Sequence, residues 1–262
     1  MPPDLLQSPI TPWLAPWADA LAALGPLDHA ARIDWLNAEA RRCGLRCAAG
    51  HPLAFAAADD AGDAPYEAHI FATGRVPTRA ATADSAHDLF NALVWLRFPQ
   101  AKAALNARQA AVLARDGVQA TRGRERDAAT LIDENALLLA CSDARLAAEI
   151  HRLLAAHAWG TLFGELRHHW YGEIVPLVFG HALLDKLQRP YKAITAHAIV
   201  FAAPDAHAFD ADAALARHLN RSLEPALLQS LPVLGVPGWW LPNEDPAFYD
   251  DARVFRPARR AA

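Results

Sequence analysis

Residues 181–202, HALLDKLQRPYKAITAHAIVFA, contain the two patterns that predict the fold class. The part up to Gln188 is apolar nearly all round at helical spacing and stops before Pro190, which is typical of a buried helix. From Tyr191 to Ala202, apolar residues occupy both alternating sets of positions, which indicates a buried strand. This part of the chain is therefore predicted to join a helix directly to a strand.

Further helices are predicted from N-caps, proline stops and apolar faces. Asp28 is the N-cap of the first, and Ser85 with Asp88 matches a capping pattern that opens another. The predicted helices cover residues 28–43, 85–98, 101–115, 143–169, 174–188 and 210–224.

Strands are predicted where short apolar runs are bounded by turn residues. They cover residues 52–58, 66–73 and 191–202, together with both halves of a hairpin over 126–141 whose turn is at 133–135. An acidic connection at 59–63 joins the first two strands, and a loop follows at 74–84. About five strands mixed with helices, without regular βαβ alternation, predict an α+β fold with a mostly antiparallel sheet.

The chain is predicted to form a single globular domain over residues 1–262. Its 262 residues are at the upper end for one domain, and no linker or change in composition divides them. Residues 1–26 are expected to form an irregular N-terminal segment. Residues 231–262, rich in proline and aromatic residues, are expected to form an irregular C-terminal strap.

Composition narrows the class of protein. Apolar residues make up 53% and charged residues 21%, which is ordinary for a soluble protein. A net charge of −4 argues against nucleic acid as a partner. No run approaches the roughly 20 apolar residues of a membrane span, and no basic region precedes Arg32 as in a secretory signal. Three cysteines cannot build a disulfide framework, so a cytoplasmic location is expected.

The first candidate site is the set His181, Asp185 and His197. His181 and Asp185 are four residues apart on the helix predicted over 174–188, so they share a face. His197 lies on the following strand and could converge with them as a divalent-metal or acid–base triad. The same residues could instead form a buried network that only holds the helix against the sheet.

Other residues could bind a ligand or take part in catalysis. Lys192 could act as a base or bind an anion, or it could lie exposed where its strand begins. His87 and Asn91 are i,i+4 neighbours in the first turns of a helix and could contact one ligand. Thr195 shares a strand face with His197. Trp239 and Trp240, in the strap, could either cover a pocket or simply pack on the body.

Several familiar motifs are absent from the sequence. It contains no GxGxxG, P-loop, GxSxG, HExxH or CxxC pair. Dinucleotide-dependent oxidoreductases, P-loop NTPases and α/β-hydrolases are therefore disfavoured.

Four blocks are distinctive: HDLFNALVWLRFPQAKAALN, RDAATLIDENALL, FGHALLDKLQRPYKAITAHA and GVPGWWLPNEDPAFYDDARVFRP. With them the chain resembles a bacterial family of uncharacterised proteins, the domain of unknown function with number three-zero-two-five. The resemblance spans about Tyr66 to Pro257. It implies no activity, cofactor or site residue.

Two functions remain in view. The first is a soluble enzyme, a metal-assisted hydrolase in which His181, Asp185 and His197 hold a divalent metal or transfer protons. The second is a non-catalytic domain that binds a small molecule or a protein, in which the same polar residues form structural networks. The sequence does not decide whether the protein is an enzyme.

Overall fold

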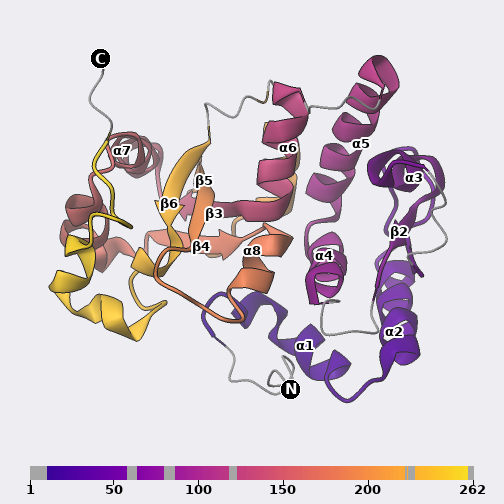
Figure 1. The fold of residues 1–262 in the computed structure, drawn as a ribbon, viewed down its shortest axis with the longest axis horizontal. Helices are drawn as coiled ribbons and strands as arrows, with labels where there is room; N and C mark the ends of the chain where they lie inside the picture. Colours follow the sequence, from indigo (N-terminus) through magenta and orange to yellow (C-terminus); the bar gives the residue numbers. More distant parts are fainter. Residues whose placement is uncertain are drawn as a thin grey trace. The chain divides into compact units, whose positions relative to one another are not determined.

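The structure is a computed structural model that describes residues 11–57, 64–79, 86–117, 123–221, 223 and 228–258. Helices and strands are mixed throughout these residues, so the protein has the predicted α+β fold (Figure 1). The chain groups into two compact units. Unit 1 includes Leu14–Asp133 and Asp212–Pro225, whereas unit 2 includes Thr11–Trp13, Glu134–Ala211 and Ala226–Ala262.

Unit 1 is mainly helical. Its helices are α1 (Ala18–Leu24), α2 (His29–Arg42), α3 (Tyr66–Thr73), α4 (Ala86–Arg97), α5 (Pro99–Asp116), most of α6 (Arg124–Asn135) and most of α9 (Ala211–Leu219). A small parallel sheet pairs β1 (Ala54–Ala56) with β2 (Arg75–Pro77). Helices α4 and α5 follow each other with only Phe98 between them, and their buried side chains include Phe90, Trp95 and Leu105.

Helix ends in unit 1 are held by side chains. The Asp28 carboxylate accepts the Ala31 N–H at 2.9 Å and caps α2, as predicted. At the start of α5, Pro99 has no backbone N–H that would need an acceptor. The Asp212 carboxylate accepts the backbone N–H groups of the next two residues, Gln100 and Ala101, at 3.1 and 2.7 Å. Asp212 lies on α9, so this cap joins segments far apart in the chain.

Unit 2 is built on a four-stranded sheet with the order β4-β3-β5-β6. Its strands are β3 (Ala136–Cys141), β4 (Ile174–Val178), β5 (Thr195–Ala202) and β6 (Gln229–Pro232). Strand β3 is antiparallel to β4 and parallel to β5, and β5 is antiparallel to β6. Two of the three pairings in this sheet are therefore antiparallel. Every residue of β3 is buried, which fits its place between two partners.

Two helices accompany the sheet (Figure 1). Helix α7 (Ala144–Ala155) packs across β3, β5 and β6, and Ile150, Leu153 and Leu154 are its buried residues. The short helix α8 (His181–Lys186) contacts β4. Among the described residues, no helix is long and apolar enough to cross a membrane.

The C-terminal strap, residues 233–258 of the described chain, consists of loops and three short 3₁₀ helices: Val233–Gly235, Leu241–Glu244 and Pro246–Asp250. Rings of the strap pack on Phe163, which lies in a π-helical turn at Gly160–Glu165. The centroids of Tyr249 and Phe255 lie 5.6 and 6.2 Å from that of Phe163. Apart from β6, which includes residues 231 and 232, the tail is as irregular as its proline density predicts.

Several predicted elements are confirmed. Helices α2 and α5 match the helices predicted at 28–43 and 101–115, and β5 lies within the strand predicted at 191–202. Helix α4 matches the helix predicted at 85–98 from Ala86 onwards, while Ser85, part of the expected capping pattern, lies outside the described residues.

Two predicted strands are helices instead. Residues 66–73 form α3, which ends at Gly74 in the left-handed conformation (φ 72°). A Cβ on Gly74 would lie 2.4 Å from the Pro52 carbonyl oxygen, so this glycine also permits close contact with the segment that leads into β1. The first half of the predicted hairpin is α6, because Ala128, Ala129 and Ile132 form one buried helical face.

Other boundaries were also wrong. Residues 174–178 form strand β4 and not helix, since Pro176 lies on an edge strand, where a missing donor is tolerated. The helix predicted at 143–169 ends at Ala155 and is followed by the π turn and a 3₁₀ turn at Arg167–His169. The N-terminal segment predicted to be irregular contains α1.

Gly180 joins β4 to α8 at a position where a side chain has no room. A Cβ there would lie 2.5 Å from the Glu134 carbonyl oxygen and 2.6 Å from the Ala136 nitrogen. We therefore expect Gly180→Ala to lower the free energy of unfolding by about 1–3 kcal/mol in urea titrations. Gly164→Ala is the control, since nothing lies within 4 Å of its added Cβ. Equal stability of the two variants would contradict the close packing at Gly180.

Candidate functional site

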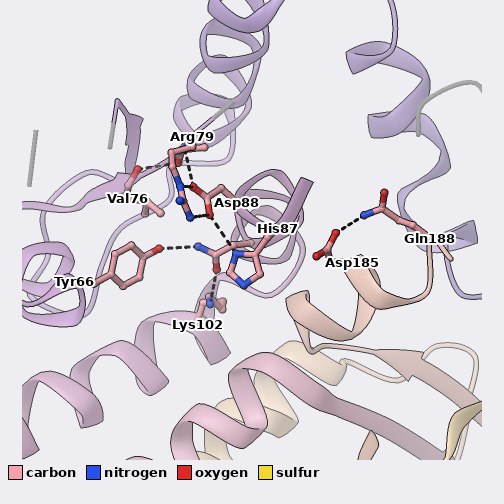
Figure 2. Close-up of polar contacts among 10 residues, drawn as sticks. Tyr66, Val76, Arg79, His87, Asp88, Lys102, Asp185 and Gln188 are labelled. Carbon is pink, nitrogen blue, oxygen red and sulfur yellow. Dashed lines mark hydrogen bonds and ion pairs between the residues drawn. The ribbon is translucent and has the colours of Figure 1, made fainter. Parts of the chain in front are cut away.

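His181 and Asp185 both lie on α8, as their spacing predicted. His181 is the first residue of the helix and is buried, with 6% of its surface exposed. Asp185 is half-buried, and its Oδ1 accepts the Gln188 Nε2–H at 2.6 Å (Figure 2). Ile174 and Val178, which were expected to extend the same helical face, belong to β4.

His197 lies on β5, opposite Ala136 of β3 and Ser230 of β6. Its Nδ1 is buried without a hydrogen-bond partner. Burial, and secondly the nearby Lys186 ammonium, lowers the pKa of His197.

The metal-binding prediction for His181, Asp185 and His197 needs correction. Among the described residues, which include all three, no three His, Cys, Asp or Glu side chains form a group that could hold a metal ion. The helix boundary was also misplaced, and Asp185 has a different partner. Strand β4 replaces the first half of the predicted helix, and the Asp185 carboxylate is bonded within its own segment.

Lys192 anchors the strap. Its Nζ lies 4.2 Å from the Phe248 ring centroid and 3.6 Å from Asp251 Oδ2. This placement does not fit the predicted base, because the ammonium already contacts a ring face and a carboxylate. Thr195 is exposed, and its hydroxyl donates to the Ala193 carbonyl at 3.3 Å.

The two strap tryptophans differ in environment. Trp239 is buried, and its ring centroid lies 5.9 Å from that of Trp13 with a tilt of 57°. Trp240 is half-buried. Their predicted role in ligand binding remains a prediction.

A buried polar network lies in unit 1 and centres on Lys102 of α5 (Figure 2). Only 4% of Lys102 is exposed. Its Nζ forms an ion pair with Asp133 of α6, donates to Asn91 Oδ1 of α4 at 2.8 Å, and lies 5.4 Å from the Trp95 ring centroid. The buried ammonium therefore has a carboxylate, an amide oxygen and a ring face around it.

The Lys102 ammonium decides how the Asn91 amide is oriented. An ammonium only donates hydrogen bonds, so the amide atom that faces it must be the oxygen. The Asn91 Nδ2–H then donates to the Tyr66 hydroxyl oxygen at 2.7 Å. Within the described part of the chain, this is the one hydrogen bond of the Tyr66 hydroxyl, and the hydroxyl accepts it. The phenolic hydrogen can therefore donate to another group.

Tyr66, at the start of α3, is a neutral phenol in this setting. Burial of its hydroxyl, and then the negative charge of Asp133, raise its pKa well above the usual range. The residue as a whole is nevertheless 40% exposed, so the ring reaches solvent. A neutral phenol at a surface is a hydrogen-bond donor for an oxygen of a ligand.

The first turn of α4 adds His87 and Asp88. Asp88 Oδ2 accepts the backbone N–H and the Nε–H of Arg79, at 2.8 and 2.9 Å, while Oδ1 lies 3.2 Å from His87 Nδ1. Burial raises the pKa of Asp88, but the hydrogen bonds from His87 and Arg79 outweigh it, and the net pKa lies below its usual range. Asp88 is thus a carboxylate that accepts a hydrogen from Nδ1, which makes Nε2 the basic nitrogen of a neutral His87.

The two predicted ligand-binding residues of α4, His87 and Asn91, therefore both belong to this network. Tyr66, Lys102 and Asp133 were missed by the sequence reasoning. Asp133 was assigned to a hairpin turn, and Tyr66 to a strand. One feature of the sequence could have indicated this network. Lys102 is a charged residue on the apolar side of a predicted helix, between Ala101 and Leu105, and both of these are buried.

With this geometry in view, the comparisons with known proteins identify the family. The model of a family described as "Protein of unknown function (DUF3025)" matches residues 53–259. The chain belongs to this family, as its distinctive blocks indicated. The search of curated proteins and the search of solved structures each found no match.

Removing Lys102 should strongly destabilise unit 1. We expect Lys102→Met to lower the free energy of unfolding by about 3–5 kcal/mol, because the Asp133 carboxylate would lose its ammonium partner in a buried site. The double variant Lys102→Met/Asp133→Leu should recover much of that loss, as measured by urea titration. Arg152→Met is the control, because its ion pair with Glu149 is exposed and is expected to contribute less than about 1 kcal/mol. A double variant as unstable as Lys102→Met would show that the ion pair is not what the site requires.

His197 should make the stability of the protein depend on pH. Because its pKa is lowered in the folded state, the unfolded chain binds the proton first as pH falls. The stability that neutral His197 contributes is present above the ordinary histidine range and is lost as pH decreases through it. His197→Gln should flatten the fall in free energy of unfolding between about pH 7 and about pH 5. The exposed His207→Gln should leave it unchanged, and an unaltered slope in His197→Gln would contradict the assignment.

Proposed function

We propose that the chain is an enzyme in which His87 and Tyr66 of unit 1 act on a substrate oxygen and its attacking water. The observation that carries the proposal is the hydrogen-bond chain from Lys102 through Asn91 to Tyr66. It holds a neutral phenol, with its hydrogen available, against Asn91, which lies one helical turn from His87 on α4. Both residues reach solvent, since the His87 side chain and Tyr66 as a whole are each 40% exposed.

The reaction class that fits these groups is hydrolysis of an ester or amide. His87 Nε2 would take a proton from water as the water oxygen adds to the carbonyl carbon. The Tyr66 hydroxyl would donate a hydrogen bond to the carbonyl oxygen as it gains negative charge. His87 would then return the proton to the leaving group. Asp88 would orient His87 and favour its charged form, the role that a carboxylate has beside a catalytic histidine.

The surroundings support this division of roles. The hydrogen bonds from Arg79 and His87 keep Asp88 ionised against the opposing effect of burial, so it can accept from His87 without taking the proton itself. Asp133 opposes ionisation of Tyr66, so the phenol remains a donor. His181, Asp185 and His197 have no part in this proposal, because among the described residues they do not form a group that could hold a metal ion.

A second candidate function is a non-catalytic domain that binds a small molecule or a protein. It is favoured by the close pairing of buried polar groups in structural roles. Asn243, 1% exposed, donates to the carbonyls of Leu234 and Val236 at 2.8 Å each and thereby secures the strap. Lys102 and Asn91 could have the same purely structural role in unit 1.

We also propose that the protein works in the cytoplasm of a bacterium. Cys43, Cys47 and Cys141 are all free thiols in the structure. Burial, with a smaller effect of the Asp143 charge, raises the pKa of the Cys141 thiol to about 12. Free thiols of this kind are usual in a reducing compartment.

The test is hydrolysis of a panel of p-nitrophenyl esters and p-nitroanilides by the full chain. We expect His87→Gln to lower kcat/KM by about a hundredfold or more, and Tyr66→Phe by about tenfold to a hundredfold, with melting temperatures close to that of the wild type. Tyr191→Phe and His207→Gln alter exposed residues of unit 2 and should change kcat/KM less than about twofold. Full activity in His87→Gln would contradict the proposal, and no turnover by the wild type would favour the binding domain.

A further inference from the structure

Buried tryptophans in unit 2 show what the indole N–H normally requires. Trp159 Nε1 donates to the Arg256 carbonyl at 2.8 Å, and Trp170 Nε1 donates to the Leu162 carbonyl at 3.0 Å. Both rings are at least nine-tenths buried. Each therefore obeys the rule that a buried donor has an acceptor.

Trp13 departs from that rule. It is 3% exposed, yet its Nε1 has no hydrogen-bond partner. The hydroxyl of Thr11, two residues earlier, is also buried without a partner. A buried donor without an acceptor costs about 1–3 kcal/mol, so two of them in three residues require an explanation.

Trp239 forms a wall beside Trp13. Its ring lies 5.9 Å from that of Trp13 between centroids and is itself only 4% exposed. The backbone around Trp239 is well fixed, because its N–H donates to the Val236 carbonyl at 3.1 Å and Asn243 binds the same carbonyl. The indole whose N–H lacks an acceptor therefore packs against a rigid aromatic surface.

We propose that Thr11, Trp13 and Trp239 form a binding site in unit 2 for a neutral aromatic compound that carries a carbonyl oxygen. The oxygen accepts the Trp13 N–H and the Thr11 O–H, and the ring of the compound packs against the two indoles. A buried anion would need a cationic partner. Because the Trp13 ring contacts another aromatic ring, the ligand is expected to be neutral. This site is independent of His87 and Tyr66.

The experiment uses acetophenone as the probe and follows the indole ¹H–¹⁵N signals of the full chain by NMR. The Trp13 signal is assigned by its loss in Trp13→Phe. Acetophenone should shift this signal in a saturable manner, whereas ethylbenzene, with the same ring but no oxygen, and benzoate, with a charge, should not. Thr11→Val should weaken acetophenone binding by about tenfold while the Trp13 signal persists.

Stability of the free protein provides a second readout. Trp13→Phe removes a donor that has no acceptor, so its melting temperature should match or exceed that of the wild type. Trp159→Phe is the matched control and should melt lower, because the Arg256 carbonyl loses a donor. If Trp13→Phe fails to fold, Thr11→Val still tests the site.

Three results would overturn the proposal. The Trp13 signal could stay unmoved up to the solubility limit of acetophenone. Ethylbenzene could shift it equally, which would show that the oxygen is not recognised. A long-lived water contact at Trp13 Nε1 that acetophenone does not displace would show that ordered water alone satisfies the donor.

Discussion

The burial of one ammonium group, that of Lys102, governs the polar interior of unit 1. A charge with 4% of its residue exposed must be neutralised and hydrogen-bonded, and Asp133 of α6 with Asn91 and the Trp95 ring of α4 meet that need. Because an ammonium only donates, it also sets the direction of every hydrogen bond that follows. Asn91 is forced to present its N–H groups to Tyr66, which becomes an acceptor with its own hydrogen left over. A packing constraint thus produces a defined chemical property at the surface.

Unit 2 follows a different principle. Strand β3 is completely buried and paired on both sides, and the rest of the unit is arranged around it. The strap has little regular backbone pairing of its own and is held by side chains instead. Arg167 donates to the Asn243 carbonyl and to Glu244, Tyr249 donates to the Gly235 carbonyl at 2.9 Å, and Lys192 lies over Phe248. Large aromatic side chains supply the burial that regular structure provides elsewhere.

The candidate residues show where sequence reasoning succeeds and where it fails. His87 and Asn91 could be found because both lie within two turns of one helix, where spacing alone predicts proximity. His181 and Asp185 lie on one helix, as their spacing predicted. Lys102 and Asp133 are 31 residues apart and Tyr66 and Asn91 are 25 apart, so their contacts depend on helix packing that no local pattern encodes. The metal site predicted from His181, Asp185 and His197 was wrong because it required a particular placement of a helix against a sheet.

By itself, the sequence determined the α+β class, helices α2, α4 and α5, strand β5, and the family to which the chain belongs. These depend on caps, proline stops and hydrophobic periodicity, which act over a few residues. Only the tertiary structure decided that residues 66–73 and 124–135 are helices, that β4 is a strand, and that the polar network lies in unit 1. Short apolar runs are compatible with either helix or strand, and long-range packing chooses between them. Likewise, a buried charge recruits its partners from whichever helices pack around it, and that choice is made in three dimensions.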